Sequence, residues 1–321
     1  MENGAERRDA AMQIRRHPQK RKVSRLMKKE ERTFYALISP FILSFVFLSI
    51  FPMGMGLFLS FTNYSGFNLD TAKWVGTSNY EKVFADSEAM HSLLRTLQLS
   101  LIIIPLTMIL AFILAMMLIQ NVKFQGGFRT IYYLPSVVPF VAAGLMWKIL
   151  FSRDRGMLNT MLGLFGIEPV FWLGPEMCST SLVIMCLWGA GGGILINIAG
   201  LKNIPNELYE SASIDGARFF TKLFRITIPL FTPILLFNLL LAIIGNLQMY
   251  AQPVMLATSG SGLLAVPFKD NYLYLVHIYQ QVFGSQRFGY GLSLSWVIVV
   301  IILVLTVLVL KSSKRWVNYD L

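Results

Sequence analysis

The stretch YESASIDGARFFTKLFRITIPL, from Tyr209 to Leu230, is the most polar long segment in the second half of the chain. It places carboxylates and cations between two apolar segments, where they could bind a partner or catalyse a reaction. Catalysis would need a recognisable base, metal cluster or activated nucleophile, and the sequence contains no HExxH, no GxSxG and no paired carboxylates. We therefore expect a binding role, with no catalytic residue, no metal site and no cofactor.

The elements around this stretch are long apolar segments. The chain has 321 residues, of which 55% are hydrophobic and 14% charged, a composition too apolar for a soluble domain. Continuous apolar runs of about 20 residues predict helices that cross a bilayer, because alternating residues would be needed for a membrane barrel. The sequence predicts an all-α integral membrane protein with six transmembrane helices, at about 34–60, 96–119, 130–150, 180–200, 227–250 and 292–310.

The distribution of Lys and Arg predicts the topology. Residues 1–32 carry eleven of the 28 cations, and most of the others fall in loops on the same side of the predicted helices. The positive-inside rule then places both termini in the cytoplasm. We expect a basic tail at 1–32, a membrane domain at 33–310 with a polar loop at about 203–228, and a short tail at 311–321. The basic tail could also bind anionic lipid or nucleic acid, but a topology anchor on membrane lipids is the simpler interpretation, and we expect no nucleic-acid partner.

The predicted helices carry no Asp, Glu, Lys or Arg at membrane depth, which disfavours ion-coupled transport. They do carry uncharged polar groups, which could line a path for a neutral, hydroxyl-rich solute, since amides both donate and accept hydrogen bonds. The alternative is that they join helices to one another. These groups are Asn197, Asn238, Asn246, Gln248, Tyr250 and Gln252. Four glycines in WGAGGGI, from Trp188 to Ile194, allow close helix contact or a local break, and Cys178 and Cys186 suit small core positions.

The 203–228 loop is predicted to form two short helices. Pro205 and Asn206 favour a helix start, and Asp215-Gly216 favours a break, at which Asp215 could cap the second helix. That second helix is amphipathic, with aromatic and aliphatic residues on one face and cations on another. The apolar face comprises Phe220, Leu223 and Phe224, and the cationic face comprises Arg218, Lys222 and Arg225. On this pattern alone the segment could lie on lipid head groups instead of binding a protein.

Glu210, Ser211 and Ala212, followed by Gly216 and then by Ile226, Ile228 and Pro229, resemble the signature loop of binding-protein-dependent ABC importer permeases. That signature reads Glu-Ala-Ala, Gly six residues after the Glu, and Ile-x-Leu-Pro from ten residues after the Gly, so Ser211 and Ile228 depart from it. Three further blocks resemble the carbohydrate branch, the maltose, glycerol-phosphate and multiple-sugar permeases. They are SPFILSFVFLSIFPMGMGLFLSFTNYSGF with WVGTSNYEKVFAD, FRTIYYLPSVVPFVAAGLMWKILFSRDRGMLN, and WGAGGGILINIAGLKNIPNELYESASIDGA.

The resemblance implies a type I ABC importer permease fold in which the 203–228 loop forms a cytoplasmic coupling helix. It implies a bacterial plasma-membrane location and several partners: a second homologous permease subunit, two cytoplasmic ATPase subunits, and an extracytoplasmic solute-binding protein that delivers a sugar. The external loops around 61–91, 148–179 and 253–290 would dock the binding protein. The ATPase-coupling residues would be Glu210, Ser211, Ala212, Asp215, Gly216 and Ala217.

For the solute path, the resemblance points to Trp188, Asn246, Gln248 and Tyr250. The chain has Asn-Leu-Gln-Met-Tyr-Ala-Gln before Pro253, where relatives have a Gln-hydrophobe-Phe-Asp pattern, so the register differs here. Two other functions stay open: a permease for a non-sugar solute such as a polyamine, phosphate or peptide, and a membrane scaffold or signalling partner that transports nothing.

Overall fold

The computed structural model describes residues 25–120, 123–258 and 262–318, so most of the predicted basic tail, 1–24, lies outside the described residues. The chain divides into two compact units, Met1–Gly56 and Leu57–Leu321. The first unit contains α2 (Arg25–Phe45), a π-helical turn, η1 (Val46–Ile50), and the start of α3 (Phe51–Ser60), which continues past Gly56. Together they form an apolar helix from Glu30 to Ser60, which matches the first predicted span.

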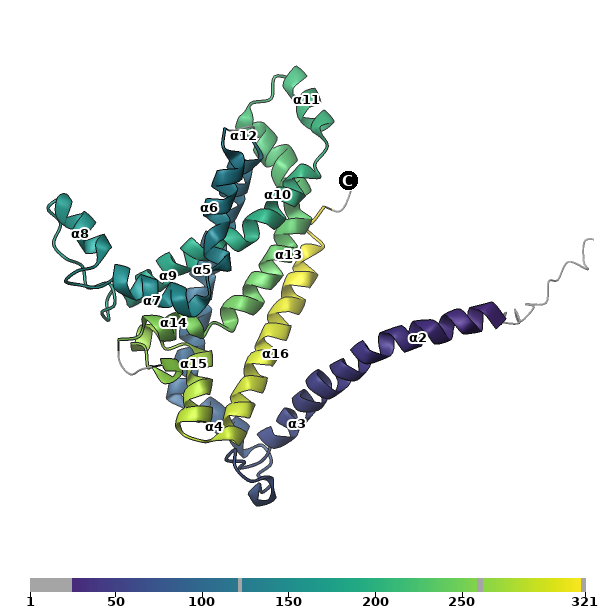
Figure 1. Ribbon diagram of the computed structural model, residues 1–321, viewed down its shortest axis with the longest axis vertical. Helices are drawn as coiled ribbons and strands as arrows, with labels where there is room; N and C mark the ends of the chain where they lie inside the picture. The colour runs from purple at the N-terminus through teal and green to yellow at the C-terminus, as the bar shows by residue number, and fades with distance from the viewer. Residues whose placement is uncertain (1–24, 121–122, 259–261, 319–321) are drawn as a thin grey trace, which may run out of the picture. The chain divides into compact units, whose positions relative to one another are not determined.

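The second unit is also helical (Figure 1). In the described part of the chain, the β-bridge between Thr62 and Trp74 stands by itself, outside any strand. The α-helices of this unit are α4 (Ser78–Ala85), α5 (Ser87–Ile119), α6 (Gln125–Val137), α7 (Phe140–Leu150), α8 (Met157–Leu164), α9 (Cys178–Trp188), α10 (Ile194–Lys202), α11 (Asn206–Ile214), α12 (Phe219–Lys222), α13 (Ile228–Leu247), α14 (Ala251–Leu256), α15 (Tyr274–Tyr279) and α16 (Phe288–Ser313). Short 3₁₀ or π turns join them: η2 (Leu69–Thr71), η3 (Gly189–Gly193), η4 (Leu223–Thr227), η5 (Gly262–Leu264), η6 (Lys269–Asn271) and η7 (Gln280–Gly284).

Helix α5 is the centre of this unit. It packs against α9, α10, α13 and α15, and its residues enter all three apolar clusters of the core. The first cluster joins it to α7, α9 and α14, the second to α15 and α16, and the third to α10 and α13. Figure 1 shows α11 and α12 at one end of this bundle and α4 and α15 at the other.

Among the residues that the structure describes, five helices are long and apolar enough to cross a membrane, at Glu30–Ser60, Ser87–Ile119, Cys178–Lys202, Phe219–Leu247 and Phe288–Ser313. The span predicted at 130–150 corresponds to α6 and α7, a pair bent by 100°, and the number of spans rises to six if this pair is one span. Val138 between them has an extended backbone (φ −68°, ψ 126°). It precedes Pro139, and a residue before proline is pushed out of the helical region, so the helix must break here.

The glycine-rich segment WGAGGGI forms both a local helix break and a close helix contact, the two structures that its sequence allows. Gly189–Gly193 form the 3₁₀ turn η3, which separates α9 from α10. At Gly191 an added Cβ would collide with the backbone carbonyl of Tyr132 in α6. Glycine is therefore needed at this position for α6 to approach the broken fourth span closely.

Candidate functional site

The 203–228 loop has the predicted two helices, and glycine geometry explains the break between them. α11 ends at Ile214, and Gly216 has φ +75°. The N–H of Gly216 donates to the carbonyl of Ser213 (3.1 Å), and the N–H of Ala217 donates to the carbonyl of Ala212 (2.8 Å). This pair of bonds is the Schellman motif, which fixes the direction of the chain after the helix.

Asp215 does not cap the second helix. It lies directly after α11 as the C-terminal cap residue of that helix, and its N–H donates to the carbonyl of Ser211 (3.1 Å). α12 begins after Arg218, whose extended backbone (φ −80°, ψ 169°) carries no side-chain cap. Because Gly216 and Ala217 separate the aspartate from that start, its carboxylate is free to face outward from the loop.

Two side-chain contacts tie α11 to the start of the fifth span. The Tyr209 hydroxyl lies 3.0 Å from Thr227 Oγ1, which is buried in η4, and Lys222 Nζ donates to Ser213 Oγ (2.6 Å). Tyr209 also packs against the apolar cluster of α5, α10 and α13. A displacement of α11 would therefore be passed directly to α13.

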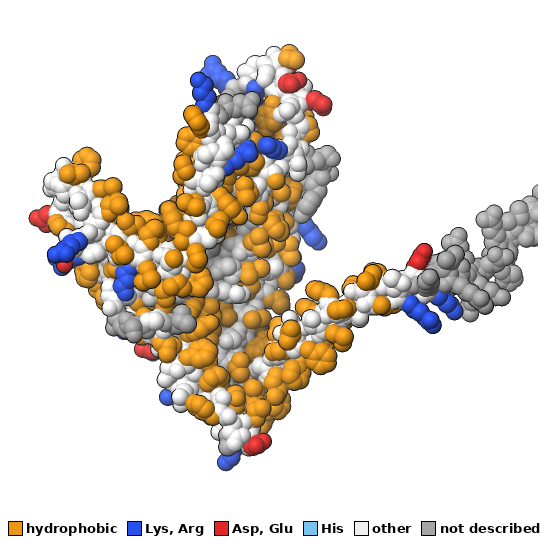
Figure 2. Space-filling model, viewed as in Figure 1, with side chains coloured by type: hydrophobic (Ala, Val, Ile, Leu, Met, Phe, Trp, Pro, Cys, Tyr) orange, Lys and Arg blue, Asp and Glu red, His pale blue; other side chains and the backbone are white. Residues whose placement is uncertain are grey.

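The outer surface of the loop is exposed and chemically mixed. Glu210 and Ser211 are exposed, and within the described ranges Glu210 has no ion-pair partner. Ile214 is 88% exposed, and Phe219, Phe220 and Phe224, which follow it in the same loop, are also exposed. Figure 2 shows blue Lys and Arg side chains near this end of the bundle. Orange apolar side chains cover most of the rest of the visible face. A carboxylate among exposed apolar groups suits a protein interface better than bulk water.

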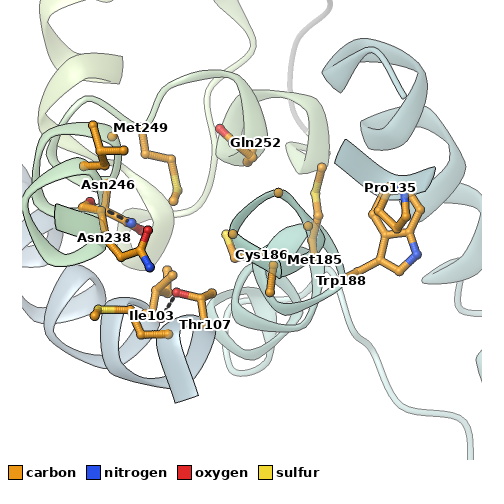
Figure 3. Close-up of a pocket in the computed structure, with 18 of the residues that line it drawn as sticks. Ile103, Thr107, Pro135, Met185, Cys186, Trp188, Asn238, Asn246, Met249 and Gln252 are labelled. Atoms are coloured by element: carbon orange, nitrogen blue, oxygen red, sulfur yellow. Dashed lines mark hydrogen bonds between the residues drawn. The ribbon is translucent and has the colours of Figure 1, made fainter. Parts of the chain in front are cut away.

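A second candidate site is a cavity of about 530 Å³ between α5, α9, α10 and α13, which we call the central cavity (Figure 3). The broken third span also borders it, through Pro135, Val138 and Phe140. Figure 3 shows Asn238 and Asn246 on one side, and Trp188 beside Pro135 on the other. The remaining polar groups in the lining are Thr107, Asn197 and Gln252. Four amides and an indole around an otherwise apolar wall can bind a molecule with hydroxyl groups and an apolar face.

The amides differ in how much hydrogen-bonding capacity they leave. Asn238 Nδ2 donates to Asn197 Oδ1 (2.6 Å), which joins α13 to α10 across the cavity wall. Asn246 Nδ2 donates to the carbonyl of Ala242 (3.0 Å), while its buried Oδ1 has no partner among the described residues. A buried acceptor without a partner is costly, so Asn246 Oδ1 is well placed to accept a hydrogen bond from a hydroxyl group of a solute.

The four predicted solute-path residues separate into two pairs. Trp188 and Asn246 line the central cavity, but Gln248 and Tyr250 are not among its lining residues. Gln248 is exposed at the end of α13. Tyr250 stacks on Tyr279, with ring centroids 3.9 Å apart. Asn197, Asn238 and Gln252, which the sequence offered either as lining of a solute path or as contacts between helices, line the cavity.

At the opposite end of the bundle, Asp86 and His277 join three helices. Asp86 Oδ1 accepts from the N–H groups of Glu88 (2.9 Å) and Ala89 (3.2 Å) at the start of α5, and Tyr290 of α16 donates to its Oδ2 (2.7 Å). His277 of α15 is fully buried, with Nε2 3.6 Å from the same oxygen. Burial lowers the pKa of His277, against the raising effect of Asp86 and Glu88. Burial raises the pKa of Asp86, but its hydrogen bonds hold that pKa below the usual value.

The sequence matches the family described as "Binding-protein-dependent transport system inner membrane component" over residues 103–318. The chain belongs to this family. The probable ABC transporter permease protein YesP of Bacillus subtilis (strain 168) is 35% identical to this inner membrane component over 303 residues, 93% of this chain and 96% of the relative. The arabinooligosaccharides transport system permease protein AraP of Halalkalibacterium halodurans is 29% identical over 268 residues, 82% of each chain.

A solved structure supports the fold of this inner membrane component. A chain from the crystal structure of a bacterial ABC transporter that imports the acidic polysaccharide alginate matches it with a TM-score of 0.78 and 23% sequence identity. The match covers 92% of this chain and 100% of that one. The expected importer permease fold is thus confirmed, and with it a multi-pass membrane protein of the transport class.

Two side-chain contacts in this protein could not be predicted from its sequence. His277 has no motif spacing to Asp86, because 191 positions separate the two residues in sequence (277 − 86). The Asn197–Asn238 bond joins two helices whose rotation depends on the break at η3. In the described part of the chain, no group of three or more His, Cys, Asp or Glu could hold a metal ion.

Proposed function

We propose that this chain forms half of the translocation path of an ATP-driven sugar importer and binds a cytoplasmic ATPase subunit through the 203–228 loop. The observation that carries the proposal is the construction of this loop. Its backbone is fixed by the Schellman motif at Gly216, its outer face exposes Glu210, and its inner face is tied to α13 through Tyr209 and Thr227. An ATPase that moves α11 would tilt α13 as a rigid body, which is how importers of this kind alternate access.

Within this proposal, each residue of the loop has a separate task. Glu210 pairs with a cation of the ATPase, and the small residues Ser211 and Ala212 allow the two surfaces to approach. Gly216 and Ala217 set the angle between the helices, and Asp215 presents a second carboxylate at the tip. ATP hydrolysis takes place on the partner, because the chain has no GxxxxGK[ST] phosphate-binding sequence of its own.

The central cavity supports a neutral sugar or oligosaccharide as the solute. Its lining carries amides, the Trp188 indole and no ionisable side chain other than Cys186, within the described ranges. An indole packs against the apolar face of a pyranose ring, and the amides bind its hydroxyl groups. The similarity to a permease for arabino-oligosaccharides agrees with this chemistry. A polyamine or phosphate would leave its charge unpaired in this cavity.

We propose the remaining assembly by analogy with the family. A second permease completes the path, two ATPase subunits bind the two permease loops, and an extracytoplasmic protein delivers the solute to the loops around 61–91, 148–179 and 253–290. Both termini then face the cytoplasm of a bacterial cell, with 33–310 in the membrane and 1–32 and 311–321 as cytoplasmic tails. Lys and Arg of the N-terminal tail and the 203–228 loop fit this orientation by the positive-inside rule.

Reconstitution of the complete transporter tests the proposal. The chain is co-expressed with a candidate second permease, an ATPase and a solute-binding protein from the same organism and placed in proteoliposomes with ATP inside. We expect ATP hydrolysis to rise only when the binding protein and one class of sugar are added together, with uptake of that sugar. Stimulation by a polyamine, phosphate or peptide would overturn the sugar assignment, and hydrolysis indifferent to every ligand would overturn transport coupling.

A further inference from the structure

A separate cavity of about 410 Å³, which we call the loop cavity, lies between the inner side of the 203–228 loop and the ends of three apolar helices. The spans Ser87–Ile119 and Cys178–Lys202 end beside it, and the span Phe219–Leu247 begins there. Apolar spans end where hydrocarbon gives way to lipid head groups. The loop cavity therefore lies at head-group depth.

The lining of the loop cavity combines an apolar wall with two cations. The wall comprises Met116, Ile119, Leu201, Ile204 and Leu223, of which Leu201 and Ile204 are buried. Lys202 and Lys222 provide the charge, with Gln120 and Asn206 as further polar groups. Within the described ranges no carboxylate lines it, so the field inside is positive. Lys222 Nζ gives one bond to Ser213 Oγ, which leaves two of its three N–H donors for a ligand.

We propose that the loop cavity binds the head group of an anionic phospholipid, with Lys202 and Lys222 as its ligands. A basic pocket between membrane helices on the cytoplasmic side is suited to an anionic head group. The first acyl carbons would lie along the apolar wall and the exposed ring of Phe219. An acidic protein segment would satisfy the lysines equally well but would leave that apolar wall in water.

This site accounts for an exposed apolar side chain beside the two lysines. Phe219 lines the loop cavity and is 57% exposed, at the start of a membrane span. A bound lipid would cover this side chain, and through Lys222 and Ser213 it would brace α12 against α11. The phospholipid would thus stabilise the orientation of the 203–228 loop, a role beyond transport coupling itself.

Titration of the purified full-length chain with phospholipid, followed by native mass spectrometry, tests the site. The probes are phosphatidylglycerol and phosphatidylcholine with identical acyl chains. We expect preferential binding of phosphatidylglycerol, weakened about fivefold by Lys202→Gln or Lys222→Gln alone and about thirtyfold by both, since each cation near a head group contributes on that scale. Binding of phosphatidylcholine should not change.

Two controls separate the site from general surface charge and from loop distortion. Lys311→Gln with Lys314→Gln removes two cations near the end of α16 and should weaken phosphatidylglycerol binding less than twofold. Ser213→Ala removes the partner of Lys222 but keeps its charge, and should retain most of the binding. Equal affinity for the two lipids, or equal losses in the two double variants, would overturn the proposal, and so would a loss in Ser213→Ala as large as in Lys222→Gln.

Discussion

The 203–228 loop and the central cavity are built in opposite ways. The loop is defined by neighbours in sequence, because the bonds that shape it join Ala212 to Ala217 and Ser213 to Gly216. The central cavity is lined by residues from α5, α6, α7, α9, α10, α13 and α14, and its amides meet only because the third span bends and the fourth span breaks. The comparison teaches that one surface can be altered residue by residue, whereas the other responds to the packing of the whole bundle.

The difference also appears in the exposure of the two regions. Glu210 and Ile214 are exposed, so the outer surface of the loop is suited to bind a large partner that covers it. Asn246 has a buried acceptor, Oδ1, without a hydrogen-bond partner in the described part of the chain, so the central cavity is suited to bind a small molecule. Substitutions in the loop should therefore affect ATPase binding, and substitutions in the cavity should affect solute transport.

The largest expected effect comes from the backbone of the loop. Gly216→Val should abolish ATP-driven transport, because a β-branched residue at φ +75° costs about 2 kcal/mol and the Schellman motif would rearrange. An added Cβ meets nothing within 4 Å, so the effect is conformational and not steric. Gly216→Asn is the matched control, since asparagine tolerates this conformation. Transport assays on both variants decide the matter, and equal activity would show that the turn is not needed.

The next effect lies in the central cavity. Asn246→Leu should lower the transport efficiency for the sugar about tenfold, the loss expected for one buried hydrogen bond to the solute. Co-purification of the ATPase should not change. Gln248→Leu, two residues along but outside the cavity lining, should change uptake less than twofold. If the two variants were equally impaired, the central cavity would not be the solute path.

A smaller effect is expected where the loop joins the fifth span. Tyr209→Phe removes the 3.0 Å contact with Thr227 Oγ1 and should lower the stability of the loop by about 1 kcal/mol. ATP hydrolysis should persist while the sugar moved per ATP falls, because α11 would then move partly without α13. The ratio of uptake to hydrolysis in proteoliposomes measures this. An unchanged ratio of uptake to hydrolysis would show that the contact of Tyr209 with Thr227 does not transmit the movement of α11 to α13.

The smallest effect should come from the far end of the bundle, away from both regions. His277 has a pKa below its ordinary value of 6.5, so the unfolded chain binds more protons than the folded one just below that pH. The melting temperature of the purified chain should therefore fall as the pH drops from 6.5 towards 5, and His277→Gln should reduce the fall. Asp86 contributes only at lower pH, because its pKa lies below 3.8. A slope identical in wild type and variant would exclude His277 as the titrating group.

Local patterns were sufficient to predict the loop but not the cavity. Pro205, Asn206 and Gly216 act on adjacent residues, so the two short helices and the break could be predicted. Asn246 could be found through its polar character within an apolar helix, whereas Trp188 was predicted only from the resemblance to sugar permeases. Gln248 was assigned with them because sequence does not fix the end of α13. The bend at Val138 follows from Pro139, but its angle of 100° depends on how α6 and α7 pack.

Co-purification of the ATPase tests the central claim most directly. The tagged chain is purified from native membranes in mild detergent as wild type, as Glu210→Lys, and as Glu176→Lys, an exposed charge reversal in the turn before α9. Mass spectrometry quantifies the partners. The account predicts that a second permease and an ATPase accompany the wild type and Glu176→Lys, and that Glu210→Lys retains the permease but loses at least nine-tenths of the ATPase, roughly the effect of losing one well-formed ion pair. Full retention of the ATPase by Glu210→Lys would contradict the account.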